Sequence, residues 1–465
     1  MLRKHWASGL AIEWIMAGLI LLSLGRVLWH LFTFKYLPAP YFYEPSDVQA
    51  DWFNTAFWSY NPHGAFDTWT TLYPPLSFVI LRALSIGECY PRSREFESSP
   101  GYAARDCDWL GHVSIYSFYV LAVVLMYVAL RKLDAKRAIP RTICIGLGWP
   151  MLNAVERGNL VLIAFPFFLL AVMPILKSAR ARWIFAALAI NLKVYLVAPF
   201  LTQLFMRRWR WVESVLVATV IVYLLSYAAF GAGTIFEIIR NLAAWSEIEI
   251  TAPLDFWPAT TYQGLVSLLE SRDQVFPTVY VLGSWTVDVV PIAVQIVLRS
   301  TQGVLLLAMI ATWLRPEAVT RYRVYLLGML FALITTEGGG YTPVFWIALI
   351  LMERWEGIGP RFALICCYVI GCSYDIPITN LATVERYSYI FDRPVIVEMD
   401  MTVWPLFRPL FIQLIAIAMA CSTIGVVWKD VRAQGWADRW RFRRDAPLLP
   451  WVQRPAPVSE RLSSK

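Results

Sequence analysis

Long apolar runs separated by polar segments organise this sequence. Runs of about 20 residues, long enough to cross a bilayer as a helix, lie at about 10–32, 112–131, 158–176, 211–231, 289–313 and 405–428. Shorter or interrupted runs lie at about 73–86, 139–154, 183–206, 323–336, 341–353 and 361–373. The pattern predicts an all-α polytopic membrane protein with about 10–12 membrane segments. It leaves open whether 73–86 crosses the bilayer or only dips into it.

The first apolar run resembles a signal peptide only superficially. Arg3, Lys4 and His5 precede it, as basic residues precede a secretory signal. The run from 10 to 32 is, however, longer than a typical signal core, and no small-residue cleavage site follows it. We therefore expect an uncleaved first span with a cytoplasmic N-terminus.

The composition supports a membrane protein. Hydrophobic residues make up 58% of the 465 positions and charged residues only 16%, whereas soluble domains carry roughly 25% charged residues. The 22 Trp and 22 Tyr residues suit a membrane–water interface. The net charge of +8 comes from short basic patches between apolar runs, which is typical of cytoplasmic loops. We therefore expect the protein to contact the lipid bilayer and to have no nucleic-acid partner.

The distribution of basic residues predicts the orientation. Basic patches lie at 131–141, 177–182, 207–210 and 315–323, and another follows Lys429. The long polar segments at about 34–72, 87–110, 233–275 and 374–404 should then lie on the opposite, outer side. We expect a single bundle over 1–446 with a large first outer loop at about 34–72. A disordered cytoplasmic tail should follow at 447–465.

Two cysteines stand in a polar segment. Cys89 and Cys107 could form a disulfide if that segment faces an oxidising compartment, or they could remain two unpaired thiols. Cys366 and Cys367 lie in an apolar run and are expected to be small packing residues.

Two apolar runs are interrupted in ways that a plain membrane helix does not tolerate. The 183–206 run contains Asn191, Lys193 and Pro199. Polar residues and irregular backbone at membrane depth are tolerated beside a cavity or inside protein. We therefore predict a broken helix whose middle lines a cavity. A second break is expected at Glu337–Gly340, between two half-length runs.

The first outer loop offers two candidate catalytic acids. Asp47 and Asp51 are four residues apart, so they would share one face of a helix. Trp52, Phe57 and Trp58 would anchor that helix at the membrane interface. A carboxylate just outside the bilayer can act as a general base. The alternative is a pair of solvated loop acids or a helix N-cap.

Two basic residues beside apolar runs are candidate anion ligands. Arg157 directly precedes the run 158–176, and an Arg fork can bind two phosphate oxygens. The alternative is an internal salt bridge between Glu156 and Arg157. Lys193 lies inside an apolar run, which indicates either a functional site or a side chain that snorkels to the interface.

Other catalytic signatures are absent from the sequence. It has no Walker loop, no His/Cys cluster with zinc-like spacing and no Ser-His-Asp spacing, and the four His residues are scattered. We therefore expect no cofactor and no metal site, although the sequence does not exclude a divalent metal.

Several of these elements, in this order, resemble the glycosyltransferase C fold and most of all glycosyltransferase family 87. That family includes polyprenyl-phosphate-mannose-dependent mannosyltransferases of bacterial envelopes. The similarity lies in about residues 40–210 and rests on an outer-loop Asp before an aromatic helix, Tyr73–Leu76, Arg157–Asn159, and Lys193 with Tyr195.

The sequence departs from the family pattern at two places. Leu196 stands where a Pro would follow the Tyr of the fourth element. The polar break at Glu337–Thr342, before Pro343 and Trp346, resembles a late Pro/Trp/His element of the family but lacks its His.

The resemblance implies an inverting sugar transfer at the outer face of the plasma (inner) membrane. The donor would be a sugar, for example mannose, on a polyprenyl phosphate, and the acceptor a lipid or glycan. Asp47 or Asp51 would be the general base, and Arg157 and Lys193 would bind the donor phosphate. The remaining residues implied to contact substrate are Tyr73, Asn159, Tyr195 and Glu337.

Two other classes of membrane protein remain open. An oligosaccharide polymerase or ligase would use Arg and His residues of a late outer loop, but 374–404 holds only Arg386 and Arg393 and no His. A transporter would favour repeats with paired broken helices, and no internal repeat is visible.

Overall fold

A computed structural model describes residues 2–90, 101–246, 257–272, 277–335 and 338–435. Most of these residues are helical, and one two-stranded hairpin is present among them. The tail predicted at 447–465 lies outside the described residues, so its predicted disorder stays a prediction.

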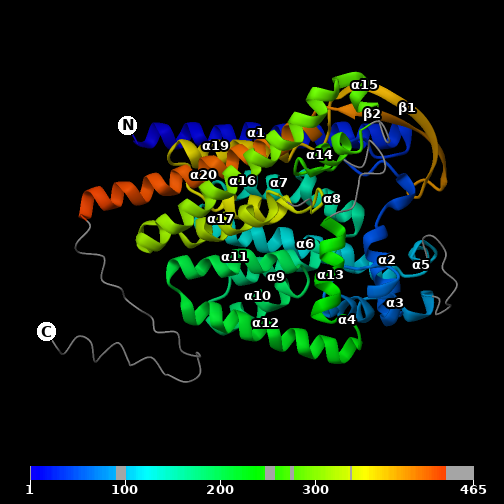
Figure 1. The fold of residues 1–465 in the computed structure, drawn as a ribbon, viewed down its shortest axis with the longest axis horizontal. Coiled ribbons are helices and arrows are strands. Elements are labelled where there is room, and N and C mark those ends of the chain that lie inside the picture. Colours follow the sequence, from blue (N-terminus) through cyan, green and yellow to red (C-terminus); the bar gives the residue numbers. More distant parts are fainter. Residues whose placement is uncertain (1, 91–100, 247–256, 273–276, 336–337, 436–465) are drawn as a thin grey trace.

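Five helices in the described part of the chain are long and apolar enough to cross a membrane. They are α1 (Leu2–Phe34), α6 (Trp109–Leu133), α12 (Trp209–Phe230), α16 (Ser284–Leu314) and α20 (Trp404–Gln434). In Figure 1 they run along the long axis of the molecule. Large apolar side chains on them are exposed, such as Leu22 at 72% and Leu225 at 68%, as suits contact with lipid. The chain is therefore a helical membrane protein, as the hydropathy predicts.

Shorter helices fill the space between the long ones. They are α7 (Ala138–Gly146), α8 (Trp149–Arg157), α9 (Val161–Val172), α10 (Ala179–Ile190), α11 (Val197–Leu201), α17 (Arg321–Leu333), α18 (Pro343–Leu351) and α19 (Ile358–Ile370). All nine residues of α18 and nearly all of α9 are buried, because helices that are apolar all round belong inside protein. Cys366 and Cys367, in α19, are buried packing residues as expected.

The helical break predicted in 183–206 is present. Helix α10 ends at Ile190, and the chain continues through two short 3-10 turns, Val194–Leu196 and Thr202–Met206, that flank α11. The Nδ2 atom of Asn191 donates to the carbonyls of Ala187 and Thr219, at 2.9 and 3.1 Å. The amide thus satisfies backbone groups at the point where the helix stops.

The 73–86 segment does not cross the bilayer as a helix. It forms α4 (Pro75–Ala83), which has nine residues and rises only about 14 Å, whereas the apolar core of a bilayer is about 30 Å thick. Helix α4 packs against α2 and α12 instead.

The polar segments gather at one end of the bundle, on the right in Figure 1. The first outer loop forms a 3-10 turn (Pro45–Asp47), α2 (Ala50–Ser59) and α3 (Pro62–Asp67). Helix α5 (Tyr102–Arg105) lies beside α2. Further short helices are α13 (Ile235–Ser246), α14 (Gln263–Glu270) and α15 (Thr278–Leu282). Helix α1 begins, and α20 ends, toward the opposite end.

The all-α prediction missed a β-hairpin in the polar segment at 374–404. Strands β1 (Pro377–Ser388) and β2 (Arg393–Thr402) pair antiparallel. The sequence of β2 carried a signal, because apolar and acidic residues alternate from Val397 to Met401. Such two-residue alternation is the period of a strand with one covered face.

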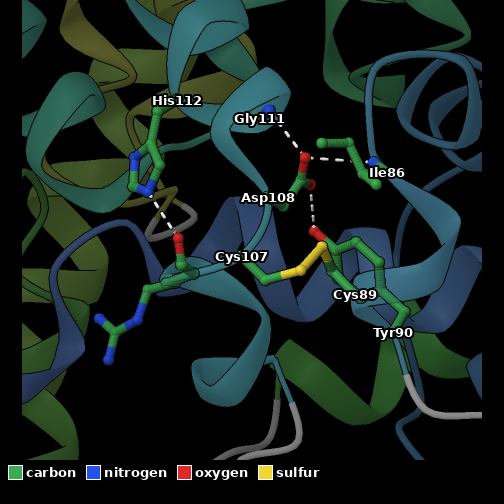
Figure 2. The surroundings of a disulfide bond; sticks show 8 residues. Ile86, Cys89, Tyr90, Cys107, Asp108, Gly111 and His112 are labelled. Atoms are coloured by element: carbon green, nitrogen blue, oxygen red, sulfur yellow. Dashed lines mark hydrogen bonds between the residues drawn. A yellow bond between two sulfur atoms is a disulfide. The ribbon is translucent and has the colours of Figure 1, made fainter.

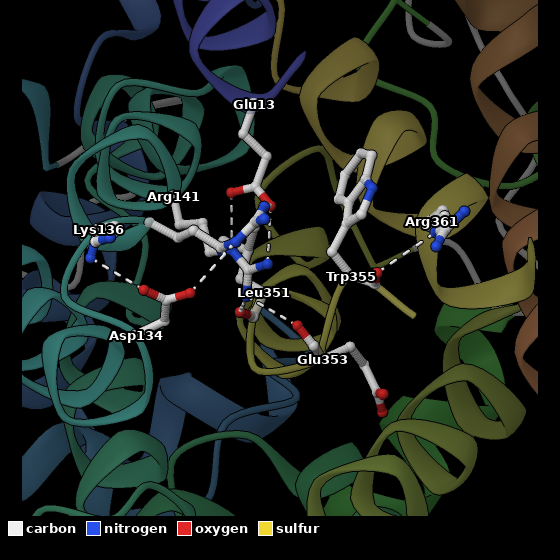
Figure 3. A network of polar contacts seen from close by, with 9 residues as sticks. Glu13, Asp134, Lys136, Arg141, Leu351, Glu353, Trp355 and Arg361 are labelled. Atoms are coloured by element: carbon white, nitrogen blue, oxygen red, sulfur yellow. Dashed lines mark hydrogen bonds and ion pairs between the residues drawn. The ribbon is translucent and has the colours of Figure 1, made fainter. Parts of the chain in front are cut away.

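A buried ion network joins α1 to the middle of the bundle. Glu13 is completely buried in the first span, and its carboxylate lies 2.6 Å from Arg137 Nη1 and 2.9 Å from Arg141 Nη2. Figure 3 shows Glu13 and Arg141 facing each other, with Glu353 nearby. Arg141 Nη1 also donates to the Glu353 carbonyl at 2.9 Å, and the Glu353 carboxylate pairs with Arg323 at 2.5 Å. Three residues of the predicted basic patches therefore lie inside the protein rather than in open loops.

Cys89 and Cys107 form a disulfide, which decides between the two alternatives left by the sequence. Next to it, Asp108 caps the first turn of α6 (Figure 2). Its Oδ1 atom accepts hydrogen bonds from the backbone N–H groups of Gly111 and Ile86, both at 3.1 Å. Its Oδ2 atom accepts from the Tyr90 hydroxyl at 2.6 Å. The disulfide and the cap together fix this polar segment to the start of α6.

Candidate functional site

The two candidate acids come from different turns, not from one helix. Asp47 ends the 3-10 turn and Asp51 lies in the first turn of α2. Gln49 separates them with a left-handed backbone (φ 60°), and its N–H donates to the Glu156 carbonyl at 2.6 Å. The predicted single helix is therefore wrong, yet the bend still directs both carboxylates to the same partner.

That partner is Arg157. Its Nη1 atom lies 2.6 Å from Asp47 Oδ2, and its Nη2 atom lies 2.8 Å from Asp51 Oδ1. The guanidinium also covers the ring of Phe42, with Cζ 4.4 Å from the ring centroid. All three charged side chains are 16–21% exposed. One Arg fork thus holds two carboxylates at the edge of the protein interior.

Glu156 is not the ion-pair partner of Arg157. The Glu156 side chain accepts a hydrogen bond from Asn153 Nδ2 at 3.0 Å, whereas the ion pairs of Arg157 are those with Asp47 and Asp51. The alternative of an internal Glu156–Arg157 salt bridge is therefore wrong.

Gly158 lets the first outer loop approach closely. It ends α8 with φ 61°, a conformation that favours glycine. A Cβ atom here would lie 3.0 Å from Trp52 Cβ and 3.1 Å from Gln49 Cα. The next residue, Asn159, donates from Nδ2 to Asp51 Oδ2 at 2.7 Å and accepts from the Val161 N–H at 3.0 Å. The segment 157–159 therefore positions Asp51 from two sides.

Lys193 is a buried cation in the break after α10. Its side chain is 8% exposed, so the alternative of snorkelling to the surface is wrong. Its Nζ atom lies 4.6 Å from the ring centroid of Tyr73 and 5.5 Å from that of Tyr341. Within the described ranges, Lys193 has neither an ion pair nor a hydrogen bond through its side chain, although Asp51 is within electrostatic range. A buried charge held only by aromatic faces is costly without an anionic partner.

Tyrosines line this cationic position. Tyr73 lies beside Asn159 and within electrostatic range of Asp51. Tyr195 is within range of Tyr73, and its buried hydroxyl has no hydrogen-bond partner in the described part of the chain. Tyr341, which sequence reasoning missed, lies just after the predicted break at Glu337–Gly340. Its position between a Gly run and Pro343 was the available signal.

The aromatic residues of α2 do not anchor it at an interface. Trp52 and Phe57 are buried at 0% and 3% exposure, and only Trp58 is partly exposed, stacked on Trp69 with 6.1 Å between ring centroids. The interfacial prediction is therefore wrong for Trp52 and Phe57, because α2 is packed into the core.

The second predicted break is present between α17 and α18. Gly340 approaches Trp149 so closely that a Cβ atom would lie 2.5 Å from that ring. Glu337 itself lies outside the described residues, so its predicted substrate contact stays a prediction.

The site therefore combines seven of the eight residues selected from the sequence. Asp47, Asp51, Tyr73, Arg157, Asn159, Lys193 and Tyr195 come together from four separate chain segments. Groups of three or more His, Cys, Asp or Glu residues able to hold a metal do not occur in the searched, described residues.

The fold and site define a helical membrane protein with an acid pair, an Arg fork and a buried Lys at one end of its bundle. No protein-family model matches the chain, and no curated protein or solved structure matches it.

Proposed function

We propose that the protein is a membrane glycosyltransferase with a glycosyltransferase C-like bundle, similar to family 87. It moves a sugar, such as the hexose mannose, from a polyprenyl phosphate to a lipid or glycan acceptor. The observation that carries this proposal is the buried Lys193, which has no ion pair in the described ranges and lies within electrostatic range of Asp51, the partner of Arg157. A site built this way suits an anionic group that arrives with the substrate.

The donor phosphate would bind between Lys193 and Arg157. A phosphate offers oxygen acceptors for the Lys ammonium and for an Arg fork. In the structure both ends of that fork are occupied by carboxylates. An incoming phosphate would therefore compete with one of them and release it for chemistry. When the sugar–oxygen bond breaks, the two cations would stabilise the charge on the departing polyprenyl phosphate.

Asp47 is the better candidate for the general base. Both oxygens of Asp51 are engaged, by Arg157 Nη2 and Asn159 Nδ2. In Asp47, Oδ2 accepts the hydrogen bond from Arg157. The other oxygen, Oδ1, accepts no hydrogen bond within the described ranges and is open to a substrate proton. The hydroxyl oxygen of the acceptor would attack the anomeric carbon on the side opposite the phosphate. Asp47 would accept the proton of that hydroxyl group during the attack. A single displacement of this kind inverts the anomeric configuration. Asp51 would position Arg157 and Asn159.

The disulfide supports an outer-face location for this end of the bundle. Disulfides persist in oxidising compartments, and Cys89–Cys107 lies next to the elements that hold the acids. We place this end at the outer face of the plasma (inner) membrane and both termini in the cytoplasm. Lipid-linked donor and acceptor would then reach the site from the bilayer.

Substitution of Lys193 tests the proposal. Membranes containing the wild-type protein should transfer radiolabelled sugar from a polyprenyl-phosphate donor, and free polyprenyl phosphate should inhibit the transfer. Lys193→Met should weaken that inhibition at least tenfold, and Lys193→Arg should restore part of it. Lys132→Met, at an exposed Lys elsewhere in the chain, is the control and should leave inhibition unchanged. Equal inhibition of the Lys193→Met and wild-type proteins would refute phosphate binding by Lys193.

A further inference from the structure

A cavity lies beside the segment that carries Asp47. It is an open cleft of about 710 Å³ between the first outer loop, α5, the start of α6 and the β1–β2 turn. Ligand sites commonly have volumes of roughly 300–1,000 Å³. Its lining residues are Ser46, Val48, Gln49, Tyr102, Arg105, Asp106, His112, Tyr116, Tyr387, Tyr389, Ile390 and Asp392.

The lining is aromatic and polar rather than aliphatic. Four tyrosines supply flat faces and hydroxyl groups, and Val48 and Ile390 are the aliphatic members of the lining set. A lipid chain would need a predominantly aliphatic wall. Tyr faces can cover the C–H surfaces of a sugar ring, while carboxylates, amides and hydroxyls bond its hydroxyl groups.

The charges in the cleft disfavour an anion. Arg105 is buried, and its Nη1 atom donates to the carbonyls of Ser46 and Val48, at 2.8 and 2.5 Å. Its guanidinium also lies 3.9 Å from the ring centroid of Tyr389. The Arg105 guanidinium thus bonds to groups of the cleft wall itself. Asp106 and Asp392 add two carboxylates to the lining. The cleft suits a neutral ligand rich in hydroxyl groups.

The cleft shares its wall with the candidate base. Ser46 and Val48, whose carbonyls Arg105 holds, are the direct neighbours of Asp47. Gln49 Nε2 donates to the Tyr116 hydroxyl at 3.3 Å across the same wall. A ligand in the cleft would therefore lie one backbone segment away from the carboxylate that accepts the proton.

We propose that this cleft binds a neutral saccharide. That this saccharide is the sugar acceptor rests on the proposed transferase function. The specificity then comes from the β-hairpin, which contributes two of the four tyrosines: Tyr387 near the end of β1 and Tyr389 in the turn that follows it. The turn closes over the loop at Tyr389, whose N–H donates to the Pro45 carbonyl at 3.3 Å.

Direct binding tests the cleft without any transfer reaction. The purified full-length protein would be placed in lipid nanodiscs, which avoids sugar-based detergents. Saturation-transfer NMR would then be recorded with mannobiose, maltose and galactobiose, and with glucuronate as an anionic comparison. At least one neutral disaccharide should give a signal that Tyr387→Ala and Tyr116→Ala each reduce at least fivefold. Both tyrosines are about half exposed, so these truncations should preserve the fold.

Two control variants identify the source of the signal. Tyr280→Ala removes an 89% exposed tyrosine outside the cleft, and Asp67→Asn removes the charge of an exposed acid of the first outer loop that lies outside the cleft lining. Both should bind the disaccharide as the wild-type protein does. No neutral disaccharide signal, or equal signals in all variants, would overturn the saccharide cleft.

A kinetic arm separates this inference from the proposed function. In the transfer assay, Tyr387→Ala should raise the acceptor KM at least tenfold and leave the donor KM within twofold. Saccharide binding that depends on Tyr387, without transfer from any polyprenyl-phosphate donor, would refute the proposed function and keep the saccharide cleft. Transfer in which Tyr387→Ala leaves the acceptor KM unchanged would refute the cleft as the acceptor site and keep the proposed function.

Discussion

Glu13 is predicted to be a principal stabilising residue of the bundle. The substitution Glu13→Gln preserves the size of the side chain but removes the charge that neutralises Arg137 and Arg141. Both arginine side chains are nearly inaccessible, at 4% and 2% exposure. Breaking a buried ion pair from one side typically costs about 3–5 kcal/mol, because it leaves an unpaired buried charge. Arg137 keeps a contact with Asp134 at 3.3 Å, and Arg141 keeps its carbonyl acceptors. We therefore expect the lower end of that range.

The assay is thermal unfolding of purified variants in one detergent at one protein concentration. The matched control is Asp288→Asn, which removes the carboxylate of an exposed pair with Arg272 at 2.9 Å. Such surface pairs contribute about 0–1 kcal/mol. Glu13→Gln should therefore lower the unfolding midpoint several times further than Asp288→Asn.

A double variant sharpens this prediction. In the Glu13→Gln background, Arg141→Met should lower the unfolding midpoint less than it does in the wild-type protein. The effects of substitutions at two residues in contact are not additive. Equal midpoints for Glu13→Gln and Asp288→Asn, or fully additive effects of Glu13→Gln and Arg141→Met, would refute the reasoning about the network.

Three further predictions concern the end of the bundle that carries the acids. Gly158→Ala should reduce transfer at least tenfold at normal protein level, because the new Cβ displaces Gln49 from between the acids; an Ala variant with wild-type activity would contradict this. Cys89→Ser opens the disulfide loop, whose ends are 18 residues apart, and should lower the free energy of unfolding by about 3 kcal/mol. Reductant should destabilise the wild-type protein by the same amount, which thermal unfolding with and without reductant checks. Burial raises the pKa of Asp375 above its ordinary 3.8. Above about pH 4 the folded protein therefore retains a proton that the unfolded chain releases. The free energy of unfolding that Asp375 contributes is thus present below about pH 4 and is lost as the pH rises through the raised pKa. Asp375→Asn should flatten that dependence in unfolding midpoints measured from pH 4 to 8, and an unchanged slope would contradict the assignment.

Hydropathy predicted the membrane class because long apolar helices in lipid have to be continuous in sequence. It could not predict the pairing of Glu13 with Arg137 and Arg141, which are more than 120 positions away. Basic residues near span ends give the same sequence signal whether they face water or a buried carboxylate. The hairpin was missed because polar outer segments were treated only as loops.

The candidate site was more accessible to sequence reasoning. Lys193 and Arg157 stand out because charge beside an apolar run is expensive, and in the structure both are within electrostatic range of Asp51. The single helix expected for Asp47 and Asp51 fails at Gln49, whose left-handed conformation no spacing rule indicates. Tyr341 was missed because aromatic residues near span ends are common.

The most direct test of the central claim is transfer of radiolabelled sugar from a polyprenyl-phosphate donor in membranes. Wild type, Asp47→Asn and Asp51→Asn would be compared at equal protein level, with Asp67→Asn as the control. Asp67 is an exposed acid of the same outer loop. A general base typically contributes about 10²–10⁴-fold in rate. We predict that Asp47→Asn loses at least 100-fold, that Asp51→Asn loses less, and that Asp67→Asn stays at the wild-type rate. Full activity in both the Asp47→Asn and Asp51→Asn proteins would contradict the account.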